Sequence, residues 1–195
     1  MNKFATIGAA CLAVALAATS PALARDGRHG GGFRGGGFGP GIAAGIVAGS
    51  VLGAKRHVCA FFHSLDEGYN VLLPFIKEGF DREEKAFHIV DPKLREEHVL
   101  RLASIGIDVE AAEQRDQFKL VNWADAYLRD GHFDQDRMLS LIQEILEAGI
   151  QQGFALTRLV AQMEWALEDR PGVDDLVEYE ARLNYLLPRY KDAVI

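Results

Sequence analysis

Short apolar runs alternate with helical patterns along residues 57–195, and this alternation is the strongest constraint on the fold. Five runs have the length and composition of strands, at 57–63, 85–91, 118–123, 154–163 and 193–195. Helical spacing of apolar residues fills the gaps, at 67–78, 92–104, 134–153 and 172–190. Strands that alternate with helices pair in parallel through right-handed crossovers. The sequence therefore predicts an α/β fold with a three-layer, doubly wound, mostly parallel sheet.

Local signals set the ends of these elements. Asp134 is a typical N-cap for the long helix that follows it, and Pro92 suits the first turn of a helix. Pro74 is expected to kink the first helix or to begin a new turn there. The last run, 193–195, has only three residues of an apparent strand. Either this strand is short, or the domain 57–195 is truncated at its C-terminus.

The first expected strand has the sequence HVCAFFH. Side chains alternate across a strand, so His57, Cys59, Phe61 and His63 are expected on one face. The turn after this strand is where a phosphate-binding loop would stand in an α/β nucleotide-binding fold, and the segment contains no such motif. This pattern favours a sensing or binding pocket over an ATPase.

The spacing limits what this strand can bind. Neighbours on one strand face lie about 6.6–7 Å apart, so His57 and Cys59 can contact one ligand. His63 lies about 13 Å beyond Cys59, so the three cannot share one metal ion. Two ligands are too few for a metal site, and we expect no metal and no cofactor. The alternative to a ligand-binding role for His57 and Cys59 is a structural one, with a hydrogen-bonded core histidine beside a buried, inert thiol.

Other polar residues have two interpretations each. Glu164 and Trp165 close the fourth expected strand, where they are candidate contacts for a small ligand or part of a strand-end turn with core packing. Glu178 and Glu180 are expected on a solvated charge face with Arg182.

The remaining histidines are expected to be structural or at the surface. His88 is expected to be a partly buried structural histidine. His98 and His132 are expected at the surface.

The N-terminal region indicates export. Residues 1–24 combine a basic start, an apolar stretch and an Ala-x-Ala ending, which predicts a signal peptide cleaved after Ala24. An uncleaved anchor is the alternative. We therefore expect an exported, periplasmic or membrane-associated protein.

Residues 25–56 read as a glycine-rich linker that contains a second apolar segment. The stretch 25–39 repeats Gly-Gly-Gly-Phe and is of low complexity. In 40–54, glycine recurs every fourth residue. This segment is either a plain linker or a glycine zipper that self-associates or associates with a membrane.

Charge and cysteine content exclude some partners and fold types. The net charge of −7 divides into 6 − 1 = +5 for residues 1–56 and 15 − 27 = −12 for residues 57–195. An acidic domain repels phosphate backbones, so we expect no direct binding of nucleic acid. Cys11 and Cys59 are the two cysteines. Cleavage after Ala24 would leave Cys59 alone, without an intramolecular disulfide.

Four ordered motifs in 57–195 resemble the MEDS domain, the sensory domain of methanogens and methylotrophs found in dichloromethane-responsive regulators. They are HVCAFF at 57–62, LLPFIKEG at 72–79, MEWA at 163–166 and YEARLN at 179–184. The resemblance implies a RecA- or KaiC-like fold without a working ATP site. It also implies that His57 and Cys59 sense small hydrocarbon derivatives. Domains of this family sit in cytoplasmic regulators, which makes a cytoplasmic location the alternative to export.

Three function classes follow from these observations. The first is a non-catalytic sensory domain that binds a small organic molecule in signal transduction, with His57, Cys59, His63, Glu164 and Trp165 as the ligand-binding residues. The second is an envelope-associated interaction module with a vestigial pocket. The third is an enzyme with Cys59 as its nucleophile, for which spacing identifies no residue that would orient the base. The output partner is not indicated by the sequence.

Overall fold

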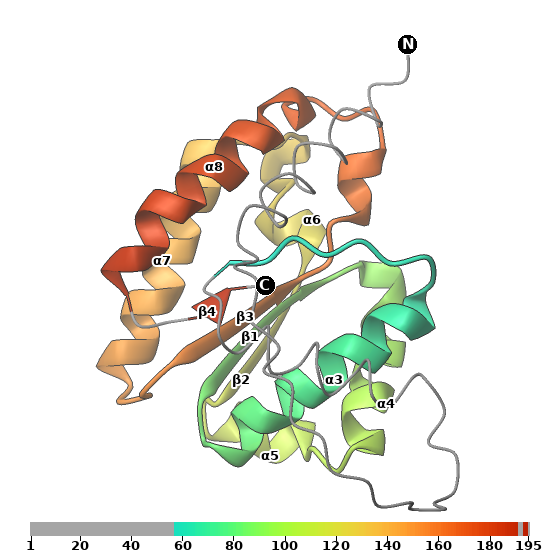
Figure 1. Cartoon of the computed structure of the whole chain (residues 1–195), viewed down its shortest axis with the longest axis vertical. Helices are drawn as coiled ribbons and strands as arrows, with labels where there is room; N and C mark the ends of the chain where they lie inside the picture. The colour runs from blue at the N-terminus through green and yellow to red at the C-terminus, as the bar shows by residue number, and fades with distance from the viewer. Residues whose placement is uncertain (1–56, 191–192, 195) are drawn as a thin grey trace, which may run out of the picture.

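The computed structural model describes residues 57–190 and 193–194. The expected signal peptide, glycine-rich linker and glycine zipper lie outside these residues. The described part of the chain forms a parallel sheet with the strand order β2-β1-β3-β4. Figure 1 shows this sheet and the helices around it. The strands are β1 Lys85–Val90, β2 Phe118–Asn122, β3 Thr157–Ala161 and β4 Ala193–Val194.

Both α-helices and short 3₁₀ helices connect the strands. The α-helices are α3 Leu65–Asp81, α4 Arg95–Ser104, α5 Val109–Gln114, α6 Trp123–Ala126, α7 Gln135–Gln151 and α8 Leu176–Leu186. The short 3₁₀ helices are η1 Pro92–Leu94, η2 Arg129–Gly131, η3 Glu164–Leu167, η4 Val173–Asp175 and η5 Leu187–Arg189. Within the described residues, none of these helices has the length and apolarity needed to cross a bilayer.

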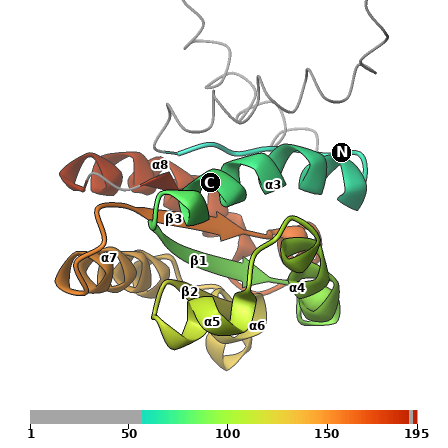
Figure 2. The ribbon, with the colours of Figure 1, turned by 90° about the horizontal axis from the view of Figure 1, so that it is seen from below.

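The sheet is covered on both faces, as a doubly wound fold requires. All six residues of β1 are buried, which is typical of a parallel strand between two helical layers. Alternate residues of β1 point to different clusters: Ala86 and Val90 pack with α3, α4 and α5, whereas Phe87 and Ile89 pack with α6, α7 and α8. Figure 2 shows the two helical layers on either side of the strands. The α/β prediction is confirmed at this level, and the RecA- or KaiC-like assignment stays a prediction.

The strand order reverses next to β1. The chain leaves β1 for β2 on one side, and then crosses over β1 to reach β3 on the other. In doubly wound sheets, ligands bind beyond the carboxyl ends of the strands at such a reversal. Here those ends are linked directly, because the Gln162 side chain after β3 accepts a hydrogen bond from the Asp91 backbone N–H at 2.8 Å.

Side-chain caps mark the beginnings of α7 and α3. The Asp134 side chain accepts a hydrogen bond from the Arg137 N–H at 2.9 Å, which confirms the predicted cap of α7. Ser64 caps α3 in the same way through the Glu67 N–H at 3.2 Å. α3 is longer than the helix expected at 67–78, and it continues through Pro74 as one 17-residue helix.

The prediction of a strand at 57–63 is wrong. Only His57 lies in a β-bridge, and residues 58–62 have no regular secondary structure. The edge position beside β3 is taken by β4, whose two residues pair with Arg158 and Leu159. The segment instead runs from the neighbourhood of β4 to the start of α3 (Figure 1). There Phe62 packs on Gly68, where an added Cβ would lie 3.1 Å from the ring.

The placement of His98 at the surface is also wrong. His98 is buried at 2% exposure, and His88 is fully buried as a structural histidine. Tyr69 Oη lies 2.7 Å from His98 Nδ1, and His98 Nε2 lies 2.9 Å from His88 Nδ1. This polar chain links α3, α4 and β1 inside the core. His98 and the buried Leu102 are four residues apart, so helical spacing was a usable signal for its burial.

Candidate functional site

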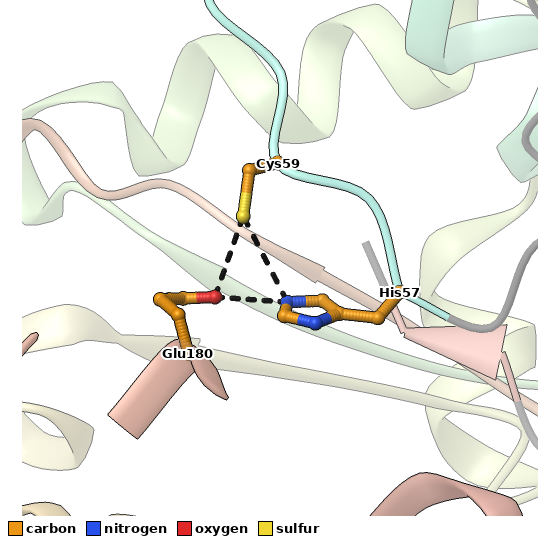
Figure 3. Close-up of side chains that lie close together, drawn as sticks. All are labelled: His57, Cys59 and Glu180. Carbon is orange, nitrogen blue, oxygen red and sulfur yellow. Dashed lines mark hydrogen bonds and ion pairs between the residues drawn. The ribbon is translucent and has the colours of Figure 1, made fainter. Parts of the chain in front are cut away.

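Side chains from distant parts of the chain meet near the beginning of the described residues. His57 and Cys59 come from residues 57–59, and Glu180 comes from α8. His57 Nε2 lies 2.9 Å from Glu180 Oε2, and the Cys59 thiol donates to the same oxygen at 3.4 Å. Cys59 Sγ and His57 Nε2 are 3.9 Å apart. Figure 3 shows the three side chains pointing toward one another, with Glu180 presented by α8. We call this group the His57–Cys59–Glu180 cluster.

The amphipathic pattern of α8 places Glu180 at the cluster. Leu176, Tyr179 and Leu183 form the buried stripe of this helix. Glu180 follows Tyr179 directly, at the border of that stripe, where a side chain is half-covered. Its side chain is 21% exposed, and that of His57 is 11% exposed. The carboxylate therefore lies at the margin of the core and not in open solvent.

Asn184 fixes the orientation of the His57 ring. Its Nδ2 donates to the Glu180 backbone carbonyl at 3.0 Å, so its Oδ1 is left to face His57. His57 Nδ1 lies 3.3 Å from that oxygen. Because an amide oxygen only accepts, Nδ1 carries a proton and Nε2 is the nitrogen directed at Glu180 and Cys59.

An aromatic layer lies beneath the cluster. Tyr127, Phe133, Trp165 and Tyr179 pack with ring centroids 5.1 to 6.3 Å apart. Burial raises the pKa of Tyr127 and of Tyr179 above the ordinary range, and the negative charge of Glu180 raises both further. The two phenols are hydrogen-bonded to each other and stay neutral. The floor of the site is thus apolar and uncharged, which strengthens electrostatic interactions among the groups above it.

Cys59 is an exposed residue. This excludes the interpretation of Cys59 as a buried, inert thiol. Phe61, two residues further, is 63% exposed. The exposed Cys59 therefore stands close in sequence to exposed apolar surface.

The structure brings together two of the five expected ligand-binding residues, His57 and Cys59. His63 is exposed in the bend before α3, where its backbone N–H donates to the Glu67 carboxylate at 2.7 Å. Glu164 and Trp165 lie in η3 after β3. Glu164 is exposed, whereas Trp165 is buried at 1% in the aromatic layer. Trp165 is part of the core packing on which the cluster rests.

The interpretation of Glu180 as a solvated residue beside Arg182 is wrong. Glu180 contacts His57 and Cys59. Arg182 instead donates hydrogen bonds to the side chains of Gln135 and Asp136 in the first turn of α7. Glu178, in contrast, is exposed as expected. The motif YEARLN at 179–184 contains both Glu180 and Asn184, so the resemblance held a signal for this pair.

Comparison with known proteins gives one match. The family described as "MEDS: MEthanogen/methylotroph, DcmR Sensory domain" matches residues 56–195, which include every residue of the cluster. A search of curated proteins and a search of solved structures each returned no match. The matched range covers well over half of the 195 residues. The chain therefore belongs to the MEDS family of sensory domains.

Proposed function

We propose that this protein is a non-catalytic sensory domain that binds small organic, hydrocarbon-derived molecules at the His57–Cys59–Glu180 cluster and acts in signal transduction. The observation that carries the proposal is the convergence of a thiol, an imidazole and a carboxylate in a member of a sensory family. These three groups together offer a soft sulfur, a hydrogen-bonding ring and a charge within reach of one small molecule.

The surroundings suit a ligand that is partly apolar. The ring of Phe61, two residues from Cys59, is exposed and offers apolar surface close to the cluster in the chain. A short alcohol, carboxylate, aldehyde or halomethane has one polar or polarizable end and a small apolar body. Such a molecule can place its polar end at the cluster and its carbon atoms against apolar surface.

The hydrogen-bond geometry favours binding over cysteine-dependent catalysis. In a cysteine enzyme the imidazole takes the thiol proton, which requires the ring nitrogen and sulfur to be direct hydrogen-bond partners. Here His57 Nε2 is 2.9 Å from the Glu180 oxygen and 3.9 Å from Cys59 Sγ, so the carboxylate is its closer partner. The amide of Asn184 orients the His57 ring, as an amide does in some cysteine enzymes. This contact is the observation that favours the second candidate function, a cysteine-dependent enzyme.

A thermal-shift screen of the full-length protein tests the proposed function. The panel contains short alcohols, carboxylates, aldehydes and halomethanes, each titrated by concentration. At 100 times its Kd a ligand stabilises the folded state by about 2.7 kcal/mol, which gives a clear rise in Tm. We expect at least one compound class to raise the Tm, and NMR of the recovered compound to show it unchanged. Turnover of the compound would contradict the non-catalytic assignment.

Matched variants assign the effect to the cluster. Cys59→Ser and Glu180→Gln are expected to abolish the Tm rise, because each removes one contact group with little change in side-chain volume. Glu178→Gln makes the same chemical change at an exposed position of α8 and is expected to respond like the wild type. A Tm rise that persists in both cluster variants, or a panel without any response, would contradict the proposal.

We also propose that residues 1–24 direct export of this domain, with residues 40–54 available for membrane association. Support comes from the basic, apolar and Ala-x-Ala order of the N-terminus. Cell fractionation of a C-terminally tagged protein, with N-terminal sequencing, tests this. A mature start at Arg25 in the periplasm or membrane fraction is the expected result, and recovery of a Met1 start from the cytoplasm would contradict it.

A further inference from the structure

The three ligand-capable atoms of the cluster have the spacing of a metal site. His57 Nε2, Cys59 Sγ and Glu180 Oε2 lie 2.9, 3.4 and 3.9 Å apart in their three pairs, and all fall within 4.8 Å of one another. A tetrahedral zinc ion has bonds of about 2.3 Å to sulfur and about 2.0–2.2 Å to nitrogen and oxygen. Such bonds place the ligand atoms about 3.3–3.6 Å apart. Shifts of about 0.4 Å would bring all three pairs to these distances.

The hydrogen bonds of Asn184 prepare His57 for coordination. The amide oxygen of Asn184 faces Nδ1, which directs the Nε2 lone pair toward the carboxylate and the thiol. Metal-binding histidines commonly donate their other N–H to a protein oxygen, which fixes the tautomer and the ring plane. Here the Asn184 amide oxygen would accept the Nδ1–H of His57. The Asn184 amide nitrogen is held in turn by the backbone carbonyl of Glu180, one turn earlier in α8.

A divalent ion would bind these groups as a thiolate, a neutral imidazole and a carboxylate. The Cys59 thiol, which now donates to Glu180, would release its proton to water on binding the ion.

We propose that the His57–Cys59–Glu180 cluster binds a divalent transition-metal ion of the zinc type, with its fourth coordination position open. The donor set of one thiolate, one imidazole and one carboxylate matches zinc, whereas magnesium and calcium prefer oxygen ligands alone. Three protein ligands with an open fourth position are the arrangement that accepts water or a small molecule.

This inference deepens the proposed function and rests on it in one respect, because the open position is where an organic ligand would coordinate. A metal ion explains how a very small molecule can be held firmly. An alcohol, carboxylate or thiol gains a direct bond to the ion, which compensates for the little apolar area that it buries. The third ligand, Glu180, comes 121 positions after Cys59 in the chain, which is why spacing along the sequence indicated only two.

Cobalt substitution tests the metal site directly. Full-length protein carrying Cys11→Ser, so that Cys59 is its single thiol, is freed of metal with a chelator and titrated with Co²⁺. We expect one equivalent to produce a sulfur-to-cobalt charge-transfer band together with the intense visible bands of a four-coordinate ion. Added Zn²⁺ is expected to remove both sets of bands, because zinc binds such sites more tightly than cobalt does. Absence of a charge-transfer band would overturn the proposal.

Variants on that background separate ligands from bystanders. Cys59→Ser is expected to remove the charge-transfer band, and Glu180→Gln to weaken Co²⁺ binding at least about 100-fold, above the range seen for supporting residues. Asn184→Ala is expected to weaken it about 10–100-fold. Glu178→Gln, the exposed control on α8, is expected to match the parent protein. Equal weakening by Glu178→Gln and Glu180→Gln would overturn the assignment, as would a band that survives Cys59→Ser.

The thermal-shift panel, repeated on the metal-free and zinc-loaded protein, distinguishes the two proposals. A response of the zinc-loaded protein alone supports both. An equal response of the metal-free protein overturns the role of the open position and leaves the sensory function standing. A cobalt spectrum of the expected kind without any response to organic molecules supports the metal site and contradicts the proposed function.

Discussion

At the scale of single residues, Arg158 shows how the fold accommodates a buried charge. It lies on β3 with 4% of its surface exposed. Its guanidinium donates to Glu84 at 2.5 Å, to the Phe75 carbonyl at 2.7 Å and to Glu78 at 3.2 Å. Gly79 makes room for it, because an added Cβ there would lie 2.7 Å from the arginine side chain. The charge is therefore paired and hydrogen-bonded at the end of the sheet opposite the strands' carboxyl ends.

Neutralising Glu84, one partner of the buried Arg158, should destabilise the folded protein. Glu84 is itself buried at 7% exposure, so Glu84→Gln leaves the Arg158 charge with little compensation from solvent. We expect the free energy of unfolding, measured by urea denaturation, to fall by about 3–5 kcal/mol. Glu78, whose side chain is 38% exposed, provides the matched control. Glu78→Gln is expected to cost less than about 1 kcal/mol, and equal losses in the two variants would show that burial does not set the strength of this pair.

At the scale of elements, the chain of Tyr69, His98 and His88 ties two helices to the central strand. Burial, with the nearby Arg95 cation, lowers the pKa of His98 to about 4. Burial also lowers the pKa of His88 well below its ordinary value, with the electrostatic effect of His98 as the second cause. Burial raises the pKa of Tyr69 to about 12. All three side chains are therefore neutral in the folded protein near pH 7.

This neutrality makes folding sensitive to mild acid. The folded-state pKa of His98 lies below the unfolded value of about 6.5, so the unfolded chain binds the additional proton as the pH falls. Stability is full above the unfolded pKa and is lost as the pH drops toward 4. Between pH 7 and pH 5, His98 alone accounts for a loss of roughly 2 kcal/mol.

A substitution at His98 isolates its share of the acid sensitivity. We expect His98→Gln to lose roughly 2 kcal/mol less than the wild type when urea denaturation is compared at pH 7 and pH 5. His132→Gln, at an exposed position, should keep the wild-type difference. A His98→Gln protein with the full wild-type loss would contradict the assignment.

At the scale of the whole molecule, the strands β1 and β2 and the helix α7 were predictable because their signals are local. Short stretches rich in apolar residues mark the two strands, and Asp134 with helical spacing marks α7. The segment 57–63 also has a strand-like sequence, yet it lies outside the sheet. Its place is decided by β4, which follows more than 120 residues later and pairs with β3. Competition for a sheet edge is a non-local effect that no window of the sequence contains.

The residues of the candidate site also differ in whether local sequence signals could identify them. His57 and Cys59 were predictable because a histidine and a thiol two residues apart are distinctive, and the family resemblance contains them. Glu180 and Asn184 were not assigned, because their role depends on how α8 packs against the start of the domain. Trp165 was assigned to the ligand, and the structure places it in the aromatic layer, since an aromatic residue after a strand serves packing as readily as binding.

The rate at which iodoacetamide alkylates Cys59 tests most directly whether small molecules occupy the cluster. Peptide-level mass spectrometry follows Cys59, while free glutathione added to the same sample reports the activity of the reagent. Compounds that raise the Tm are predicted to slow alkylation of Cys59 in proportion to their occupancy and to leave alkylation of glutathione unchanged. An unchanged Cys59 rate at a saturating concentration of such a compound would place its binding elsewhere and contradict the account.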